Sequence, residues 1–203
     1  MLTEPTTGML DLNEYRNKIY PRVFLIDELI QELQYALGEA ADMEADFPIA
    51  KEWLHGLAVG YVIDRGERFT FISKRHLGDQ LTEAALDEMA QANFARDFKF
   101  RLVKTIFGGF ALEGAADHCA TAIFVGPIWE WVVNYFGKDL VVAFPSYDLL
   151  FLTPADDEQG ISNLKMELYK IQGMGIEKRI GDYLFLYKKE EKAWSFIGEV
   201  GGE

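Results

Sequence analysis

The sequence predicts an α+β protein made of two similar β-β-α-β-β units, with mainly antiparallel sheets, helices on one face of the sheets and an additional N-terminal helix. Short apolar runs come in pairs that turn residues separate, as in hairpins. A helical pattern follows each pair, and the whole order recurs about 80 residues further along the chain. Helices that cover antiparallel sheets are one way to bury such elements.

Three segments are expected within one compact globule. Residues 1–56 form a lead-in and a helix, residues 57–126 form the first unit, and residues 127–203 form a connecting helix and the second unit. A chain of 203 residues is long enough to bury roughly 70% of its unfolded surface without disulfides or metal. Its one cysteine, Cys119, excludes an intramolecular disulfide and fits a reducing compartment.

The N-terminal helix is expected to begin at Pro21, because proline is favoured at the first helical position, and to end at about Leu37. Its apolar residues recur at spacings of three and four, which places them on one face: Val23, Ile26, Ile30, Leu33 and Leu37.

The first unit is expected to open with strands at 57–64 and 69–73, joined by a turn in which Gly66 can take a positive φ. Thr82 is a predicted N-cap for a helix that runs to about Arg96. A second hairpin, split by Gly108 and Gly109, closes the unit with strands at 98–107 and 110–112.

The second unit repeats this order with a hairpin at 139–153, a helix at about 158–172, and strands at 183–187 and 194–197. The acidic run Asp156-Asp157-Glu158 suits the start of that helix, because carboxylates offset the exposed N–H dipoles there.

Between the units, residues 127–136 predict a helix that is apolar on two sides. One side carries Trp129 and Val132, whereas Trp131 and Tyr135 point away from it. Two interpretations stay open: burial of both sides between the sheet units, or contact of one side with a partner or another copy of the chain.

The formal net charge of −13 argues against one class of partner and favours another. The first fifty residues alone hold ten acidic and three basic side chains. Such a surface repels phosphate backbones, which argues against nucleic acid, and attracts a basic protein. The alternative is that the charge serves solubility alone. No apolar run approaches the length of a membrane span and no basic-then-apolar leader is visible, so a soluble cytoplasmic protein is expected.

The densest cluster of reactive residue types is Asp117-His118-Cys119. Neighbouring side chains rarely aim at one point, so Cys119 is expected to be a buried apolar group rather than a nucleophile paired with His118. His118 and Asp117 could still line a polar pocket with Asp148. The three histidines are too widely spaced for a local metal motif, and neither a metal nor a cofactor is predicted.

Residues 140–151 form a strand–Pro–x–x–Asp–strand stretch. This stretch resembles a segment of the YtpQ-like bacterial family, whose function is uncharacterised, and the likeness spans residues 19–198. The family often shows an Asp-Ala-Ser step, which here reads Asp117-His118-Cys119. The resemblance implies the fold and carries over no catalytic residue. Shorter similar stretches are Ile19-Tyr20-Pro21, Val62 to Gly66, Leu81 to Asn93 and Trp194 to Gly198.

The leading functional prediction is a non-catalytic acidic interaction module that binds a basic protein partner or itself. One alternative is a hydrolase-type enzyme with a polar pocket at Asp117, His118 and Asp148. Another is an immunity-like protein that neutralises a basic toxin. The candidate binding residues are Asp117, His118, Asp148, Trp131 and Tyr135.

Overall fold

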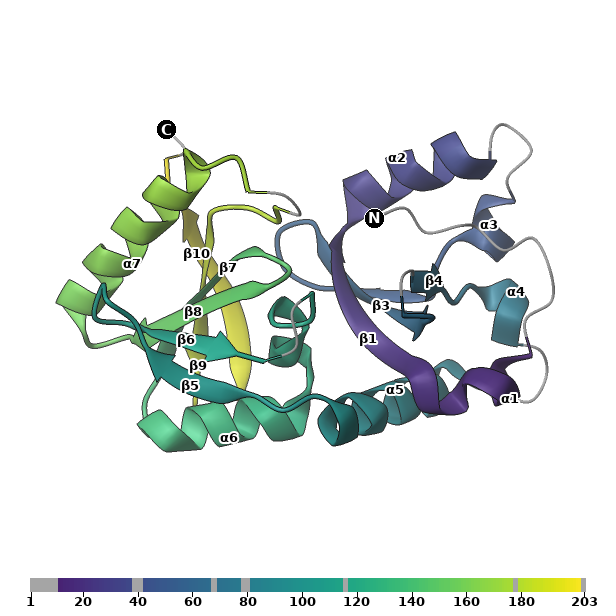
Figure 1. The fold of residues 1–203 in the computed structure, drawn as a ribbon, viewed down its shortest axis with the longest axis horizontal. Helices are drawn as coiled ribbons and strands as arrows, with labels where there is room; N and C mark the ends of the chain where they lie inside the picture. Colours follow the sequence, from purple (N-terminus) through teal and green to yellow (C-terminus); the bar gives the residue numbers. More distant parts are fainter. Residues whose placement is uncertain are drawn as a thin grey trace. The chain divides into compact units, whose positions relative to one another are not determined.

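The structure is a computed structural model that describes residues 11–37, 42–66, 69–77, 81–114, 117–176 and 179–201. The chain divides into two compact units between Asp97 and Phe98. Each unit contains one antiparallel sheet accompanied by helices, which confirms the predicted α+β class (Figure 1).

Unit 1 is built around a small sheet in which the central strand, β3, pairs with every other strand. β1 lies along one edge of β3, and β2 and β4 pair with successive parts of β3. In chain order its elements are α1 (Leu12–Tyr15), η1 (Arg16–Lys18), β1 (Ile19–Leu25), α2 (Ile26–Leu37), α3 (Met43–Asp46), β2 (Ala50–Glu52), β3 (Leu57–Asp64), β4 (Phe69–Phe71), α4 (Lys74–Leu77) and α5 (Glu83–Asp97).

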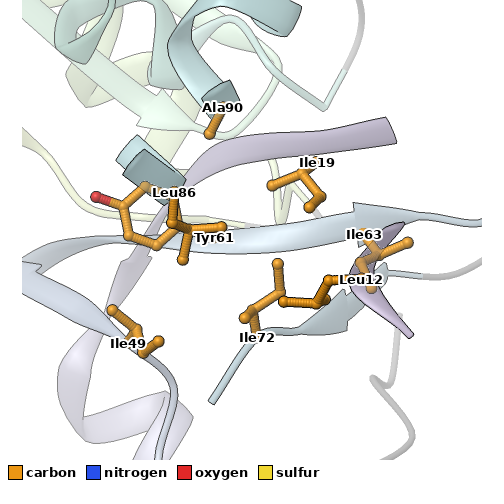
Figure 2. Close-up of a cluster of buried hydrophobic side chains, with 8 residues drawn as sticks. All are labelled: Leu12, Ile19, Ile49, Tyr61, Ile63, Ile72, Leu86 and Ala90. Carbon is orange, nitrogen blue, oxygen red and sulfur yellow. The ribbon is translucent and has the colours of Figure 1, made fainter. Parts of the chain in front are cut away.

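The sheet of unit 1 is covered by a helix on each face. Ile19 and Tyr61, from one face, pack with Leu86 and Ala90 of α5 in the buried cluster of Figure 2. Neighbouring residues of a strand point to opposite faces. Phe24 therefore lies on the other face, where it packs with Ala58, Leu29 and Leu33. The last two belong to α2, so the layers run helix, sheet, helix.

The start of the N-terminal helix differs from the sequence prediction. Pro21 lies inside strand β1, and α2 begins only at Ile26. β1 pairs with β3 alone, so it is an edge strand, where a residue without an N–H is tolerated. The β-branched and aromatic residues around Pro21 favour an extended conformation, and the edge position allows the proline within it.

A buried amide holds the start of β1 against α5. The side-chain nitrogen of Asn93 donates hydrogen bonds to the carbonyl oxygens of Arg16, at 2.7 Å, and Ile19, at 2.9 Å. Asn93 and Ile19 are both buried, so water does not compete for the bond between them, whereas the bond to the carbonyl of Arg16 is only part-buried.

Unit 2 is larger and contains a six-stranded sheet in the order β10-β9-β7-β8-β6-β5, in which every pairing is antiparallel. In chain order its elements are β5 (Arg101–Lys104), β6 (Phe110–Glu113), η3 (Ala120–Phe124), α6 (Gly126–Phe136), β7 (Leu140–Ser146), β8 (Leu149–Pro154), α7 (Glu158–Gln172), β9 (Tyr183–Lys188) and β10 (Ala193–Glu199).

Helices also cover both faces of the second sheet. On one face Val141, Ala143 and Phe151 pack with Leu164 and Leu168 of α7. The opposite face carries Tyr187, whose ring meets Trp129 of α6 at a centroid distance of 5.4 Å. The prediction of helices on one face only is therefore wrong in both units.

The predicted duplication is not confirmed. The hairpin β5-β6 was expected to close the first β-β-α-β-β unit, but β6 pairs with β8 through Phe110 with Leu152 and Ala111 with Phe151. The hairpin thus belongs to the second sheet. For the same reason the division after Asp97 differs from the expected segment ends at residues 56 and 126.

Within the described residues, no helix is both long and apolar enough to cross a lipid bilayer.

Candidate functional site

The predicted polar residues of unit 2 meet at one end of its sheet, around the turn between β7 and β8. The backbone N–H of Ala120, at the start of η3, donates to the carbonyl of Tyr147 in that turn at 3.1 Å. This bond places the segment Asp117-His118-Cys119 beside Asp148. The predicted polar pocket at Asp117, His118 and Asp148 stays a prediction.

Asp117 turns the chain so that the next two side chains enter the core. Its φ of 60° lies in the left-handed region, which aspartate tolerates better than most residues. His118, only 4% exposed, packs its ring against Phe98 at a centroid distance of 4.4 Å. This position makes the imidazole part of the interior rather than a group that faces solvent.

Cys119 is a buried thiol, not an activated nucleophile. Burial raises its pKa to about 11, and the negative charges of Asp148, Glu113 and Asp117 add to the effect, against a hydrogen bond with the backbone of Gly114. At neutral pH the sulfur therefore keeps its proton, and the thiolate that nucleophilic chemistry requires is scarce.

Asp148 is held by its own turn. The buried hydroxyl of Ser146 donates to Oδ1 of Asp148 at 2.5 Å. Among the residues that the structure describes, no hydrogen bond joins Asp148 to His118. In a nucleophile–histidine site a third group orients the histidine base, and Asp148 does not supply that contact to His118.

A partly buried ion pair lies at the same end of the sheet, and the sequence did not predict it. Arg179 and Asp182 form a salt bridge, and the backbone N–H of Ile180, between them, donates to the carbonyl of Pro145 at 2.8 Å. Asp182 is 2% exposed, and its Oδ1 has no hydrogen-bond partner within the described part of the chain. Burial raises the pKa of Asp182, with Glu199 adding to the effect and Arg179 opposing it.

The sequence contained one weak signal for this pair. Asp182 stands directly before the apolar strand β9, where a carboxylate is easily buried with its neighbours. A base at position 179, beside Lys178 in the sequence, is by itself equally typical of a solvated surface, so Arg179 carries no signal of its own.

The other predicted binding residues, Trp131 and Tyr135, lie on the outer side of α6. Trp131 is 43% exposed and Tyr135 is 63% exposed, with the ring of Tyr135 at 6.5 Å from that of Phe110. On the inner side, Trp129 packs between Tyr187 and Trp194 of the sheet. α6 thus has apolar residues on two sides, of which the inner side is buried and the outer side is exposed.

The outer side of α2 forms a different kind of surface in unit 1. Asp27 and Glu28 are exposed in its first turn, and Tyr35, in its last turn, is 88% exposed. Unit 1 as a whole has 18 acidic and nine basic residues, whereas unit 2 has 15 and 11. Most of the net negative charge therefore belongs to unit 1.

No group of three or more histidine, cysteine, aspartate or glutamate side chains within the described ranges is arranged to hold a metal ion.

Comparison with known proteins adds no relative: no family model, curated protein or solved structure matches the chain. The resemblance to the YtpQ-like family stays a prediction.

Proposed function

We propose that this protein is a non-catalytic interaction module that binds a basic protein partner through unit 1. The observation that carries the proposal is the net charge of −9 on residues 1–97, against −4 on the remainder of the chain. Charge of one sign concentrated in one unit steers an oppositely charged protein toward that unit and speeds association.

The outer side of α2 is the proposed contact surface. Its inner side is already occupied, because Leu29 and Leu33 pack on the sheet. Outward, Asp27 and Glu28 offer carboxylates and the exposed Tyr35 offers an aromatic face, to which lysine and arginine side chains bind through cation–π contacts. Carboxylates also stabilise a helix at its N-terminus, so Asp27 and Glu28 serve the fold as well.

The chemistry of the polar cluster in unit 2 supports a role other than catalysis. Cys119 is protonated at neutral pH, and Asp148 accepts its hydrogen bond from Ser146. The cluster therefore supplies little thiolate at neutral pH, and the carboxylate of Asp148 is engaged by its own turn.

The test is binding of a fluorescent oligolysine peptide to the full chain, followed by anisotropy at low and at moderate salt. The variant Asp27→Asn/Glu28→Gln/Tyr35→Ala removes the proposed surface. A matched variant, Glu83→Gln/Glu88→Gln/Ala92→Ser, removes the same charge from the exposed side of α5.

We expect the α2 variant to weaken binding at least tenfold and the α5 variant to weaken it no more than about threefold, since loss of net charge alone acts through screened, long-range attraction. Equal losses in both variants would mean that the peptide senses only net charge, and the proposed surface would then be rejected.

A further inference from the structure

Strand β5 lies at the edge of the second sheet, where it pairs with β6 alone within the described ranges (Figure 1). Just after the strand, the N–H of Thr105 donates to the carbonyl of Gly109 on the β6 side at 2.9 Å. Hydrogen-bonded and non-hydrogen-bonded pairs alternate along an antiparallel ladder, so Val103, two residues earlier, also bonds to β6. The N–H and carbonyl groups of Leu102 and Lys104 therefore point outward from the sheet.

These outward backbone groups fit one kind of occupant, which is another extended strand. A row of N–H and carbonyl groups at a sheet edge is a template for strand addition, in which main-chain hydrogen bonds supply the affinity. Leu102 and Val103 are half-buried in the middle of β5, whereas Arg101 and Lys104 are exposed at its two ends. An added strand therefore meets the pattern base, apolar, apolar, base.

The charge of this edge is opposite to that of the chain. Residues 98–112 contain three basic side chains and no acidic one, although the net charge of the chain is −13. Two of the bases, Lys99 and Lys104, are exposed and form no ion pair with any described residue. The third, Arg101, pairs with Glu113 of β6 at 2.8 Å, but both side chains are exposed and such pairs contribute little. The edge therefore favours a strand that carries carboxylates.

We propose that β5 is the docking site for an extended acidic segment of a partner protein, which adds one strand to the six-stranded sheet. The segment carries carboxylates opposite Arg101 and Lys104, and apolar β-branched residues between them. This inference goes beyond the binding of a basic protein and does not rest on it, because that partner is assigned to unit 1.

The same charges exclude a second copy of this edge as the occupant. If the β5 strands of two copies paired with each other, the bases of one strand would lie against the bases of the other. Like charges opposite each other destabilise a strand pair, and lysine at an edge is one means by which proteins prevent self-association. The charge that rejects a copy attracts a carboxylate, so it selects an acidic partner.

The probe is a fluorescent peptide that contains the run Glu-Val-Val-Glu between serine residues, and anisotropy measures its binding to the full chain. Two control peptides separate charge from backbone pairing. In one, glutamine replaces both glutamates. In the other, the backbone nitrogens of both valines are methylated, which keeps the charge but removes the N–H donors. We expect each change to weaken binding at least tenfold.

A matched pair of variants tests the charge on the protein side. Lys99→Gln/Lys104→Gln removes two charges from the edge, and Lys165→Gln/Lys170→Gln removes two from the exposed side of α7. We expect the edge variant to weaken binding at least tenfold and the α7 variant no more than about threefold, since distant charges act only through screened attraction. Thermal unfolding of both variants establishes that the fold is unchanged.

Amide hydrogen exchange of the original chain locates the docking edge without any substitution. When the peptide binds, the N–H groups of Leu102 and Lys104 gain hydrogen-bond partners and should exchange at least tenfold more slowly. The N–H of Val103 already bonds to β6 and should change little. Binding that leaves Leu102 and Lys104 unprotected would mean that the peptide senses charge alone, and the proposal would then be rejected.

Three other results overturn the proposal. Absence of peptide binding would leave the bases as protection against self-association alone. Equal weakening by the edge and α7 variants would remove the assignment to β5. Protection of Leu102 and Lys104 that appears when the chain is concentrated without peptide would identify a second copy as the occupant. Because oligolysine binding is measured separately, failure of the acidic peptide leaves the proposed function of unit 1 standing.

Discussion

The two units share one layered plan and differ in what they expose. In each, an antiparallel sheet carries helices on both faces. Unit 1 concentrates negative charge, whereas unit 2 has 18 of the 28 aromatic residues of the chain. Charge acts at long range and aromatic side chains act in contact. The same arrangement of layers thus supports two different kinds of recognition surface.

The buried polar groups differ in the same way. Unit 1 buries the neutral amide of Asn93, whose two donated hydrogen bonds satisfy backbone carbonyls. Unit 2 buries the carboxylate of Asp182, which has Arg179 on one oxygen and no hydrogen-bond partner, among the described residues, on the other. A neutral anchor stabilises at every pH, whereas a buried charge makes stability depend on pH. This difference predicts how the stability of each unit depends on pH.

The largest effect is expected from Asn93→Leu. It leaves the buried carbonyl of Ile19 without its donor, at a cost of about 1–3 kcal/mol, and removes a second, part-buried hydrogen bond to the carbonyl of Arg16, so we expect a loss of about 3 kcal/mol in the free energy of unfolding. Urea denaturation measures the loss, and amide hydrogen exchange should locate it in unit 1. Ala92→Leu, on the exposed side of α5, is the control. A loss of the same size at pH 4 and pH 7 is expected, and a strong pH dependence would contradict the neutral-anchor interpretation.

How far this contrast follows from the sequence depends on the range of the interactions. Local signals were sufficient for β3 and α7, whose bounds match the prediction, and for the N-cap of α5, where the N–H of Ala85 donates to Oγ1 of Thr82 at 3.2 Å. Periodicity and capping residues determine such elements within a few residues of chain.

Non-local information was what the sequence did not provide. A hairpin signal predicts that β5 and β6 pair with each other, but it does not say that β6 joins β8. In the candidate site, proximity of Asp117 to Asp148 was predicted, whereas the burial of Asp182 was missed because it depends on packing around Pro145 and β9. Pro21 was misassigned because only the sheet order shows that β1 is an edge.

The second prediction reverses the pH behaviour in unit 2. Arg179→Met removes the cation beside Asp182, and a buried pair that loses one partner is destabilised. Arg179 is 37% exposed, so we expect a loss of about 2 kcal/mol at pH 7 rather than the larger values of fully buried pairs. Equilibrium urea unfolding at several pH values measures it.

The sign of the pH dependence follows from the raised pKa of Asp182 in the folded state. Below the usual carboxyl pKa, Asp182 is neutral in both states and Arg179 has no charge to balance. As the pH rises through the folded pKa, the carboxylate ionises and its burial is penalised, more so without Arg179. The loss of unfolding free energy in the variant, relative to the original chain, should therefore be small at pH 3.5 and reach its full size at pH 7. Asp182→Asn in the variant should recover most of the loss, and equal losses at both pH values would contradict the assignment.

The smallest effect tests how closely unit 2 packs a helix on its sheet, and it concerns the two ends of α7. Replacing a helical glycine with alanine ordinarily stabilises by up to about 1 kcal/mol, because the unfolded chain loses freedom. At Gly160 a Cβ would meet Oγ1 of the buried Thr153, and it would lie 2.6 Å from Oδ2 of Asp157, the N-cap of the helix. Gly160→Ala therefore has to move either β8 or the cap. We expect a loss of about 1–2 kcal/mol in unfolding free energy.

At the other end, Gly173 has αR backbone angles and its nearest neighbour, the carbonyl of Lys170, lies at 3.5 Å, so Gly173→Ala should be neutral or slightly stabilising. Thermal unfolding of the two variants side by side measures the contrast. If both alanines stabilise, α7 is not pressed against β8 at its N-terminus, and close packing ceases to distinguish that end of the helix.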